Sequence, residues 1–416
     1  MSQPFAIYTV GGAVRDALLG LSVKDRDYVV VGANPEQLQA LGYVPVGKDF
    51  PVFLHPETHE EYALARTERK TAPGYAGFAF HAAADVTLEQ DLLRRDLTIN
   101  AIAMDGHGNL IDPYGGQADI KNKIFRHVST AFTEDPVRIL RLARFAARFP
   151  DFSIAPETMQ LMQTMVQAGE VDALVPERVW QELSRGLMEK KPSRQFQVLH
   201  ECGALQKILP ELSALEKHTH TNLSQSEKNA FMRALQVVDF AAEKNTNLAI
   251  RVTALLCDVE KVHDEHESHA SALVSLSTKL VETLCARIKI QNEVRDLAIM
   301  LARESTNLHR AEVLSAELLV KLLERCDALR RPERFNELLI AMECHQLVLA
   351  ESQDMKLLQT TILRSALAAV QSVSAGAIAA TVATQVESNA AVHIAQAIHK
   401  ARVTAVEQML NQKRSS

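Results

Sequence analysis

Paired cysteines, long apolar runs and an excess of positive charge are all missing from this sequence. The five cysteines of the 416-residue chain are scattered and odd in number, without a Cys-x-x-Cys pair. This pattern indicates neither a disulfide framework nor a zinc knuckle, and it favours a reducing, cytoplasmic location. No apolar run reaches the ~18 residues that a membrane-spanning helix needs, and the first ten residues lack the charged and apolar regions of a signal peptide. We therefore expect no membrane partner, and nothing in the sequence indicates a protein partner.

Acidic residues outnumber basic ones, with 51 Asp and Glu against 45 Lys and Arg and a net charge of −6. The total charge therefore does not attract the chain to nucleic acid, and such a partner would have to contact a local basic face. A chain of this length is expected to form two or three domains, because one domain takes about 100–200 residues.

The character of the sequence changes near Asp135. Before this point, short apolar runs separated by turn-prone residues predict β-strands. These runs are Ile7–Val10, Tyr28–Val31, Val52–Leu54 and Tyr62–Ala65. The segment Thr67–Gly77 carries charge, proline and two glycines, and is predicted to be a loop. After Asp135 helical periodicity dominates, so the sequence predicts an α+β part followed by an all-α part.

The stretch Gly11–Val31 combines two features of a nucleotide site. Its paired glycines allow the backbone to approach a phosphate, and a helix N-terminus there would favour anionic charge. Asp25 and Asp27 alternate along an expected strand, so their carboxylates would share a face and could hold Mg²⁺. Each feature alone is most often a turn or a solvated loop, but together they predict nucleotidyl transfer. Glu61 is a candidate third carboxylate, and an exposed acidic residue is an equal alternative.

Two arginine-rich segments are candidates for contacts with the nucleotide. Arg94, Arg95 and Asp96 form either a charged helix start or a set of groups for triphosphate oxygens and a ribose hydroxyl. Further along, Pro136 suits the first turn of a helix. Four arginines on that helix fall within about a third of its circumference. They are Arg138, Arg141, Arg144 and Arg148. A solvated cationic face is the alternative, but arginine without lysine favours phosphate and base-edge contacts.

Taken in order, these motifs resemble those of the bacterial class II CCA-adding tRNA nucleotidyltransferases, in the DNA polymerase β-like superfamily. The matching segments are GGAVRD at 11–16, KDRD at 24–27, RRDLTINA at 94–101, EDPVRILRLARF at 134–145, PERVWQEL at 176–183 and ECGALQKILPEL at 201–212. Bacterial poly(A) polymerase shares the motif set and is the alternative of the same class. A non-catalytic RNA-binding relative is a further alternative, although the motif carboxylates and arginines are present.

The resemblance implies a fold, an activity and a division into domains. It implies a polymerase β-like nucleotidyltransferase head with a mixed sheet over residues 1–135. A helical neck over 136–225 would bind the nucleotide base and tRNA, and a helical body and tail would cover 226–416. The implied reaction is addition and repair of the tRNA 3′-terminal CCA from CTP and ATP, with release of pyrophosphate and with Mg²⁺ as cofactor.

The resemblance also implies roles for individual residues. Asp25 and Asp27 would hold the catalytic Mg²⁺, and Gly12 and Arg15 would contact the phosphates of the incoming nucleotide. Arg95, Arg141 and Arg144 would bind ATP or CTP, and Asp96 would bind the ribose. Asp135 and Arg138 would read the base. Thr67–Gly77 would be the flexible loop needed for the final addition of A.

The C-terminal half departs from members that carry an HD phosphohydrolase domain. The matching region, about 226–310, reads LLCDVEK where His-Asp-Leu-Gly-Lys would stand, so Cys257 precedes Asp258. Histidines lie loosely around this pair, and such residues in a polar loop are more often solvated than bound to metal. They are His218, His220, His263, His266 and His269. We therefore predict that the helical scaffold survives without its metal site, which argues against a phosphohydrolase.

Overall fold

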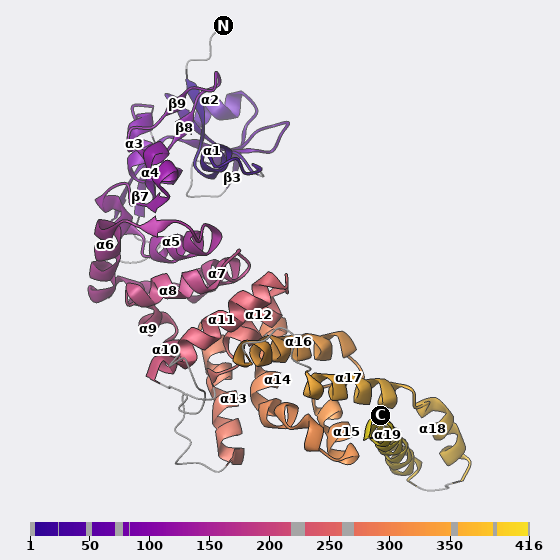
Figure 1. Ribbon diagram of the computed structural model, residues 1–416. Helices are drawn as coiled ribbons and strands as arrows, with labels where there is room; N and C mark the ends of the chain where they lie inside the picture. Colours follow the sequence, from indigo (N-terminus) through magenta and orange to yellow (C-terminus); the bar gives the residue numbers. More distant parts are fainter. Residues whose placement is uncertain are drawn as a thin grey trace. The chain divides into compact units, whose positions relative to one another are not determined.

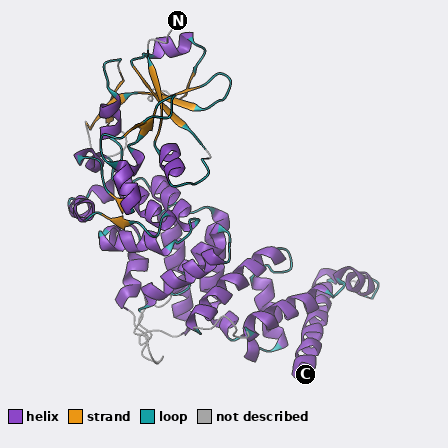
Figure 2. Ribbon diagram, turned by 45° about the horizontal axis from the view of Figure 1, so that its top comes forward, coloured by secondary structure: helices purple, strands orange, loops and turns teal. Residues whose placement is uncertain are grey.

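The structure is a computed structural model that describes residues 5–23, 25–46, 52–70, 78–82, 84–217, 229–259, 270–350, 357–385 and 389–414 (Figure 1). The chain forms two compact units. Unit 1 comprises Met1–Gly186 and Arg194–Ile208, and unit 2 comprises Leu187–Ser193 and Leu209–Ser416. Every strand of the described residues lies in unit 1, whereas unit 2 is helical there (Figure 2).

Unit 1 is built on a mixed seven-stranded sheet with the order β3-β4-β5-β2-β1-β8-β9. The strands are β1 (Ala6–Val10), β2 (Asp27–Val31), β3 (Val44–Val46), β4 (Val52–Leu54), β5 (Glu61–Leu64), β8 (Ala103–Met104) and β9 (Leu110–Ile111). Strand β2 runs antiparallel to β1 and parallel to β5. The four strands predicted from apolar runs are therefore confirmed, β4 with the predicted bounds and the other three with bounds that differ by one residue.

Alternating residues of β2 enter two different cores. Val29 packs with Val10 and Leu92 on the face covered by α3 (Leu88–Leu93). Val30 packs with Leu38 on the face covered by α2 (Pro35–Ala40). Since side chains alternate along a strand, Asp27 belongs to the same face as Val29 and continues it toward the end of the sheet.

Two predictions made from local pattern need correction. Residues Thr67–Lys70 are not a loop: they belong to β6 (Arg66–Lys70), which pairs antiparallel with β7 (Phe78–Ala82). Pairing with β7 supplies hydrogen-bond partners that the charged sequence alone does not reveal. The remainder of the predicted loop, 71–77, lies outside the described residues. Strand β2 begins at Asp27, so Asp25 precedes the strand instead of alternating along it.

The rest of unit 1 comprises short elements and helices. They include α1 (Gly12–Leu18), η1 (Thr98–Asn100), α4 (Gly116–Asn122), β10 (Ile124–Phe125), η2 (Thr130–Glu134), α5 (Val137–Arg148), β11 (Ser153–Ile154), α6 (Pro156–Gln167), η3 (Glu170–Ala173), α7 (Pro176–Leu187), α8 (Ser193–Glu201) and α9 (Ala204–Ile208). Helix α5 begins at Val137 with Pro136 at its N-cap position, so Pro136 precedes the first turn instead of standing in it. The Asp135 carboxylate accepts a hydrogen bond from the Val137 backbone N–H at 3.0 Å.

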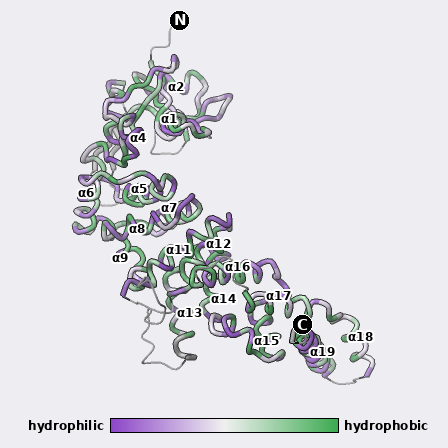
Figure 3. Tube along the Cα trace, in the orientation of Figure 1, coloured by the Kyte–Doolittle hydropathy of each residue, from purple (hydrophilic) through white to green (hydrophobic). Residues whose placement is uncertain are grey.

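Unit 2 packs its helices around buried aliphatic residues such as Leu297, Leu319 and Leu339. Its helices are α10 (Pro210–Ala214), α11 (Ala230–Glu243), α12 (Leu248–Leu255), α13 (Ala270–Arg287), α14 (Asn292–His309), α15 (Ala316–Arg325), α16 (Pro332–Leu349), α17 (Leu358–Gln371), α18 (Ala375–Ala383) and α19 (Ala390–Arg414), with 3-10 turns η4 (Leu215–Lys217) and η6 (Ala311–Val313). Hydrophilic and hydrophobic residues alternate along the helices of both units, as amphipathic packing requires (Figure 3).

Across the described part of the chain, no single helix has the length and apolar composition to cross a membrane. One pair of helices, α17 and α18, meets these criteria only when taken together across a 43° bend.

Candidate active site

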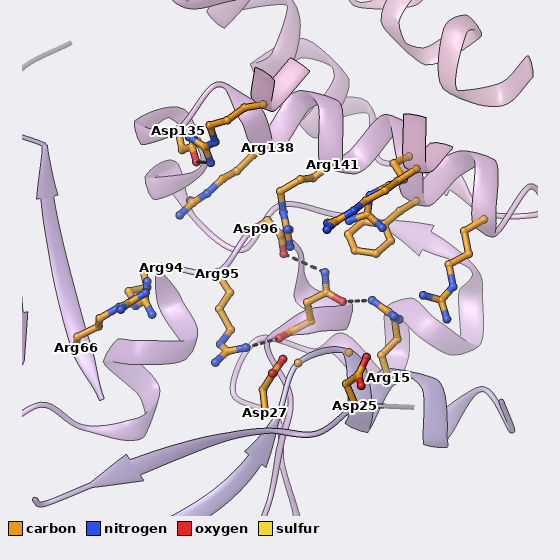
Figure 4. Close-up of a pocket in the computed structure, with 18 residues that line it drawn as sticks. Arg15, Asp25, Asp27, Arg66, Arg94, Arg95, Asp96, Asp135, Arg138 and Arg141 are labelled. Atoms are coloured by element: carbon orange, nitrogen blue, oxygen red, sulfur yellow. Dashed lines mark hydrogen bonds and ion pairs between the residues drawn. The ribbon is translucent and has the colours of Figure 1, made fainter. Parts of the chain in front are cut away.

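A cavity of about 750 Å³ in unit 1 collects the predicted site residues (Figure 4). Its lining contains ten arginines and four aspartates, so it is strongly basic although the whole chain is acidic. The lining residues are Gly11, Gly12, Arg15, Asp25, Asp27, Arg66, Arg94, Arg95, Asp96, Asn100, Asp135, Arg138, Arg141, Arg144, Phe145, Arg148, Arg178 and Arg185. Every nucleotide and metal residue named from the motifs is therefore brought to one cavity.

Asp27, the first residue of β2, and Asp25, two residues before it, are the candidate metal carboxylates, and both face the cavity (Figure 4). Partial withdrawal from water raises the pKa of Asp27, and the charge of Asp25 adds to this rise while Arg95 opposes it. Glu61 on β5 is the register partner of Asp27, but it is exposed and does not line the cavity. The two interpretations of Glu61 therefore both stay open.

The turn between β1 and α1 brings the backbone close to an arginine of the cavity. Gly11 has a φ of +71°, and a Cβ atom there would lie 3.0 Å from a terminal nitrogen of Arg95. A larger residue would be strained and would displace the guanidinium, which gives the first of the paired glycines a steric reason. Gly12 then begins α1 and lines the cavity beside it.

Asp91 positions both arginines of the Arg94-Arg95 pair. Its side chain is fully buried on α3, and its two oxygens each accept a hydrogen bond from one guanidinium at 3.2 Å. Burial alone would raise the pKa of Asp91, but Arg95 and Arg94 outweigh it and lower the pKa. Asp91 therefore remains ionised and fixes two cationic groups on one side of the cavity.

Asn100 joins residues that the motifs treat separately. Its amide oxygen accepts a hydrogen bond from Arg15 at 2.6 Å, and its amide nitrogen donates to Asp96 at 3.0 Å. The other oxygen of Asp96 accepts from Arg141 at 2.8 Å. Burial would raise the pKa of Asp96, but Arg141 and the hydrogen bond from Asn100 hold it well below its ordinary value. This chain of hydrogen bonds links α1, η1 and α5.

Arg15 is held more deeply than its predicted contact with phosphate suggests. It is 3% exposed, and its guanidinium donates two hydrogen bonds to Asp16, at 2.7 and 2.9 Å. The other oxygen of Asp16 accepts from Arg148 at 2.8 Å. Burial lowers the pKa of Arg15, and the charge of Asp16 opposes that change. Arg15 therefore contributes a fixed charge at the base of the cavity.

Helix α7 supports the base-reading and phosphate-binding candidates of α5. Arg178 donates to Asp135 at 3.0 Å, and Glu182 accepts from Arg144 at 2.6 Å. Arg138 donates to the backbone oxygen of Ala131 at 2.6 Å. The motif PERVWQEL contains both α7 residues at a spacing of four, which places them on one helix face.

Several residues of the cavity were not chosen from the sequence. Asn100 lies in the motif RRDLTINA and Arg178 in PERVWQEL, so the motifs could have indicated that both residues belong to the site. Arg66 and Arg185 belong to no motif used in the prediction, and only the folded chain places them at the cavity.

The fold and this cavity define a nucleotidyltransferase with a polymerase β-like head, as the sequence predicts. Residues 7–126 match the family described as the poly A polymerase head domain. Residues 151–215 match the probable RNA and SrmB-binding site of polymerase A. The chain belongs to the family of multifunctional CCA proteins. It is 57% identical to such a protein from Herminiimonas arsenicoxydans over 98% of both chains, and 56% identical to one from Janthinobacterium sp. (strain Marseille), again over 98% of both.

Solved structures of CCA-adding enzymes share the fold. An apo form has a TM-score of 0.66 and 21% identity, covering 98% of this chain and 92% of its own. The Bacillus stearothermophilus enzyme in complex with CTP has a TM-score of 0.63 and 22% identity, covering 99% and 94%. The predicted family and fold class are confirmed. The alternative of a poly(A) polymerase is not favoured, because relatives that match nearly the full chain at more than half identity are multifunctional CCA proteins.

A second cluster of polar residues lies in unit 2, around the Cys257-Asp258 pair that replaces the His-Asp pair of HD phosphohydrolases. The carboxylate of Asp258 is buried and accepts a hydrogen bond from Arg233 at 2.6 Å. Its other oxygen lies 3.0 Å from Nε2 of His345. The Cys257 sulfur and these His and Asp atoms lie within 4.8 Å of one another, so the set resembles a metal site. The guanidinium of Arg233 already neutralises the aspartate there. The five histidines of the sequence prediction lie outside the described residues.

We expect the full chain to lack Mg²⁺- or Ni²⁺-stimulated hydrolysis of 2′,3′-cyclic nucleotides. A protonated thiol is a poor Mg²⁺ ligand, and Arg233 already compensates the charge of Asp258. The measurement is chromatography of 2′,3′-cyclic AMP after incubation with a preparation that is active in CTP incorporation. Metal-stimulated hydrolysis that Asp258→Asn abolishes, with thermal stability unchanged, would contradict this prediction.

Proposed function

We propose that the cavity of unit 1 catalyses template-independent addition and repair of the 3′-terminal CCA of tRNA from CTP and ATP. The tRNA 3′-hydroxyl attacks the α-phosphate of the bound nucleotide, and the bond to pyrophosphate breaks. The observation that carries this proposal is the convergence of Asp25 and Asp27 with ten arginines in one cavity. It agrees with the family, whose structural relatives include a Bacillus stearothermophilus CCA-adding enzyme in complex with CTP and a Thermotoga maritima enzyme complexed with tRNA.

Asp25 and Asp27 are the residues that would hold a divalent cation, which we propose is Mg²⁺. The donor set suits this ion, because both groups offer hard oxygen ligands. Partial withdrawal from water is the main cause of the raised pKa of Asp27, and the nearby charge of Asp25, which adds to it, is one that a bound cation would compensate. When bound, the cation supplies activation of the attacking hydroxyl and neutralises charge on the leaving oxygens.

The arginines and the α1 turn would bind the rest of the nucleotide. Arg95, Arg141 and Arg144 present guanidiniums to the cavity, each fixed by a carboxylate, so their orientation is set before a triphosphate arrives. Gly12 and Arg15 would add charge complementarity near the phosphates. Asp96 would accept a hydrogen bond from a ribose hydroxyl. The carboxylate oxygen that accepts this bond would also keep its hydrogen bond from Asn100 or from Arg141.

Asp135 and Arg138 would read the base. Both line the cavity, where Arg178, another lining residue, holds Asp135 and the backbone carbonyl of Ala131 holds Arg138. Support of this kind restricts their rotamers, so the remaining donor and acceptor positions face the nucleotide in a defined geometry.

We propose three domains with the bounds that the sequence indicates. Residues 1–135 would carry out nucleotidyl transfer, residues 136–225 would bind the nucleotide base and tRNA, and residues 226–416 would form a helical body and tail. The helical part would hold tRNA through its backbone and shape, because A-form RNA offers side chains little direct base readout. We infer a cytoplasmic location, where this substrate is processed.

The test is incubation of the purified chain with tRNA that lacks its 3′-terminal CCA, in the presence of labelled CTP, ATP or both. We expect two cytidylates and then one adenylate, resolved by sizing the product on a denaturing gel. UTP and GTP serve as negative controls. A long A tail formed with ATP alone would identify a poly(A) polymerase instead, and no incorporation at all would leave a non-catalytic RNA-binding relative.

A further inference from the structure

A second cavity, of about 560 Å³, lies within unit 2 between α13, α14, α15 and α16. Its charged lining residues are Glu282, Arg295, Asp296, Arg303, Arg325 and Arg334. None of them belongs to the sequence motifs or to the transferase cavity. Arg295 and Arg303 lie on α14 with Ile299 between them, at steps of four residues that share a helix face.

Carboxylates compensate the four arginines of this cavity only in part. Glu304, buried behind the lining, accepts hydrogen bonds from Arg325 through both oxygens, at 2.9 and 2.8 Å, and from Arg303 at 3.3 Å. Asp296 accepts from Arg295 at 2.8 Å and lies 3.7 Å from Arg334. Four guanidiniums thus face three carboxylates, counting Glu282, and the cavity keeps an excess positive charge.

Arg334 is the member with the weakest internal partners. Its Nε atom is buried and makes no hydrogen bond to any described residue, and its one ion pair, with Asp296, is long. The Arg334 guanidinium lines the cavity and its ion pair is long, so its N–H groups there are suited to an acceptor that comes from outside the chain. Arg295, which shares Asp296 with it, would complete a two-pronged contact.

We propose that this cavity binds a phosphate group, supplied either by the backbone of the bound RNA or by free phosphate or nucleotide. Guanidinium forks match the oxygens of phosphate, and an acidic chain can meet a polyanion only at such local basic sites. The RNA source rests on the proposed function, in which the helical part holds tRNA, and gives that contact a site; the cavity shares no lining residue with the transferase cavity. Its test measures binding instead of nucleotide addition, so failure of one is distinguishable from failure of the other.

The test compares the double variant Arg295→Gln/Arg334→Gln with the control Arg310→Gln/Arg330→Gln in the full chain. The control removes the same charge from exposed positions of unit 2 outside the cavity. Fluorescence anisotropy would measure affinity for tRNA lacking its CCA end between 50 and 200 mM salt. If the ligand is RNA, the cavity variant should bind roughly tenfold more weakly than the control, and its log–log salt slope should fall by about 1 for each lost phosphate contact.

A second arm identifies a small ligand. The thermal midpoint of the unmodified chain would be compared in phosphate and in chloride at equal ionic strength. A phosphate-dependent rise that the cavity variant loses and the control keeps, with tRNA affinity unchanged, would assign free phosphate or a nucleotide.

Two single variants guard against misfolding. Arg334→Lys should weaken binding while keeping the charge, and Asp296→Asn should strengthen it. If neither arm separates the cavity variants from the control, the proposal is wrong.

Discussion

Replacing Asp25 or Asp27 by alanine is expected to reduce nucleotide incorporation by about 10³-fold or more, a loss of at least ~4 kcal/mol of transition-state stabilisation. Each substitution removes a carboxylate from the proposed metal site, and no other acidic side chain of the lining lies at that end of β2 (Figure 4). Both residues are exposed, so the core of unit 1 should remain intact. The measurement is single-turnover incorporation of labelled CTP into tRNA lacking its CCA end, in saturating Mg²⁺.

Glu57→Gln is a matched control, since Glu57 is an exposed acidic residue of the same unit outside the cavity, and its activity should be unchanged. Glu61→Gln separates the two interpretations of Glu61: a large loss would make it a third metal carboxylate, and normal activity would make it a surface residue. Incorporation at the unmodified rate by either purified Asp25 or Asp27 variant would refute the assignment of the metal site.

The raised pKa of Asp27 adds a pH dependence to the same site. A carboxyl with a raised pKa begins to take up a proton at a higher pH than an ordinary aspartate, and the protonated form is a poor ligand. As the pH is lowered, the affinity of the nucleotide-free chain for Mg²⁺ should therefore begin to weaken at a pH higher than the pH at which an ordinary aspartate becomes protonated. Asp27→Ala should remove this dependence together with the binding.

Asp135→Ala or Arg138→Ala is expected to relax or destroy the preference for CTP and ATP over UTP and GTP, with metal binding retained. An ionised Asp only accepts hydrogen bonds and Arg only donates them. Cytosine and adenine each present an amino donor beside a ring-nitrogen acceptor, which complements this pair. Uracil and guanine place a carbonyl acceptor where Asp135 needs a donor. An unpaired buried group typically costs about 1–3 kcal/mol, or roughly 5–150-fold in discrimination.

The measurement is kcat/KM for each of the four nucleotides, with Mg²⁺ affinity determined separately. Arg178→Ala is an informative third variant, because it leaves Asp135 in place but removes the guanidinium that holds it at 3.0 Å. We expect a smaller loss of discrimination from this change, and none in metal affinity. Unchanged preference in both the Asp135 and Arg138 variants would exclude this pair as the protein template and direct attention to Arg141 or to the segment 67–77 that was predicted to be the flexible loop.

The sequence alone determined four strands of the head and the candidate nucleotide and metal residues that line its cavity. Alternation of apolar residues and the turns between them are local properties, so β1, β2, β4 and β5 could be predicted from chain neighbours. These candidate residues stand in short motifs whose spacing reflects local geometry, such as the helix face that presents Arg138 and Arg141. Where local pattern was insufficient, the prediction was wrong: Thr67–Lys70 is a strand because β7 pairs with it.

Only the tertiary structure decided which partner each charged group has. Asp16 meets Arg148 across 132 positions of sequence, and Arg144 meets Glu182 across 38. In the second cavity, Arg325 and Arg334 likewise meet carboxylates of another helix, Glu304 and Asp296 on α14. The pairing of a buried charge depends on which helices pack together, and many arrangements of the same amphipathic helices satisfy the same local pattern. Packing selects one of them because a buried charge without its partner is strongly destabilising.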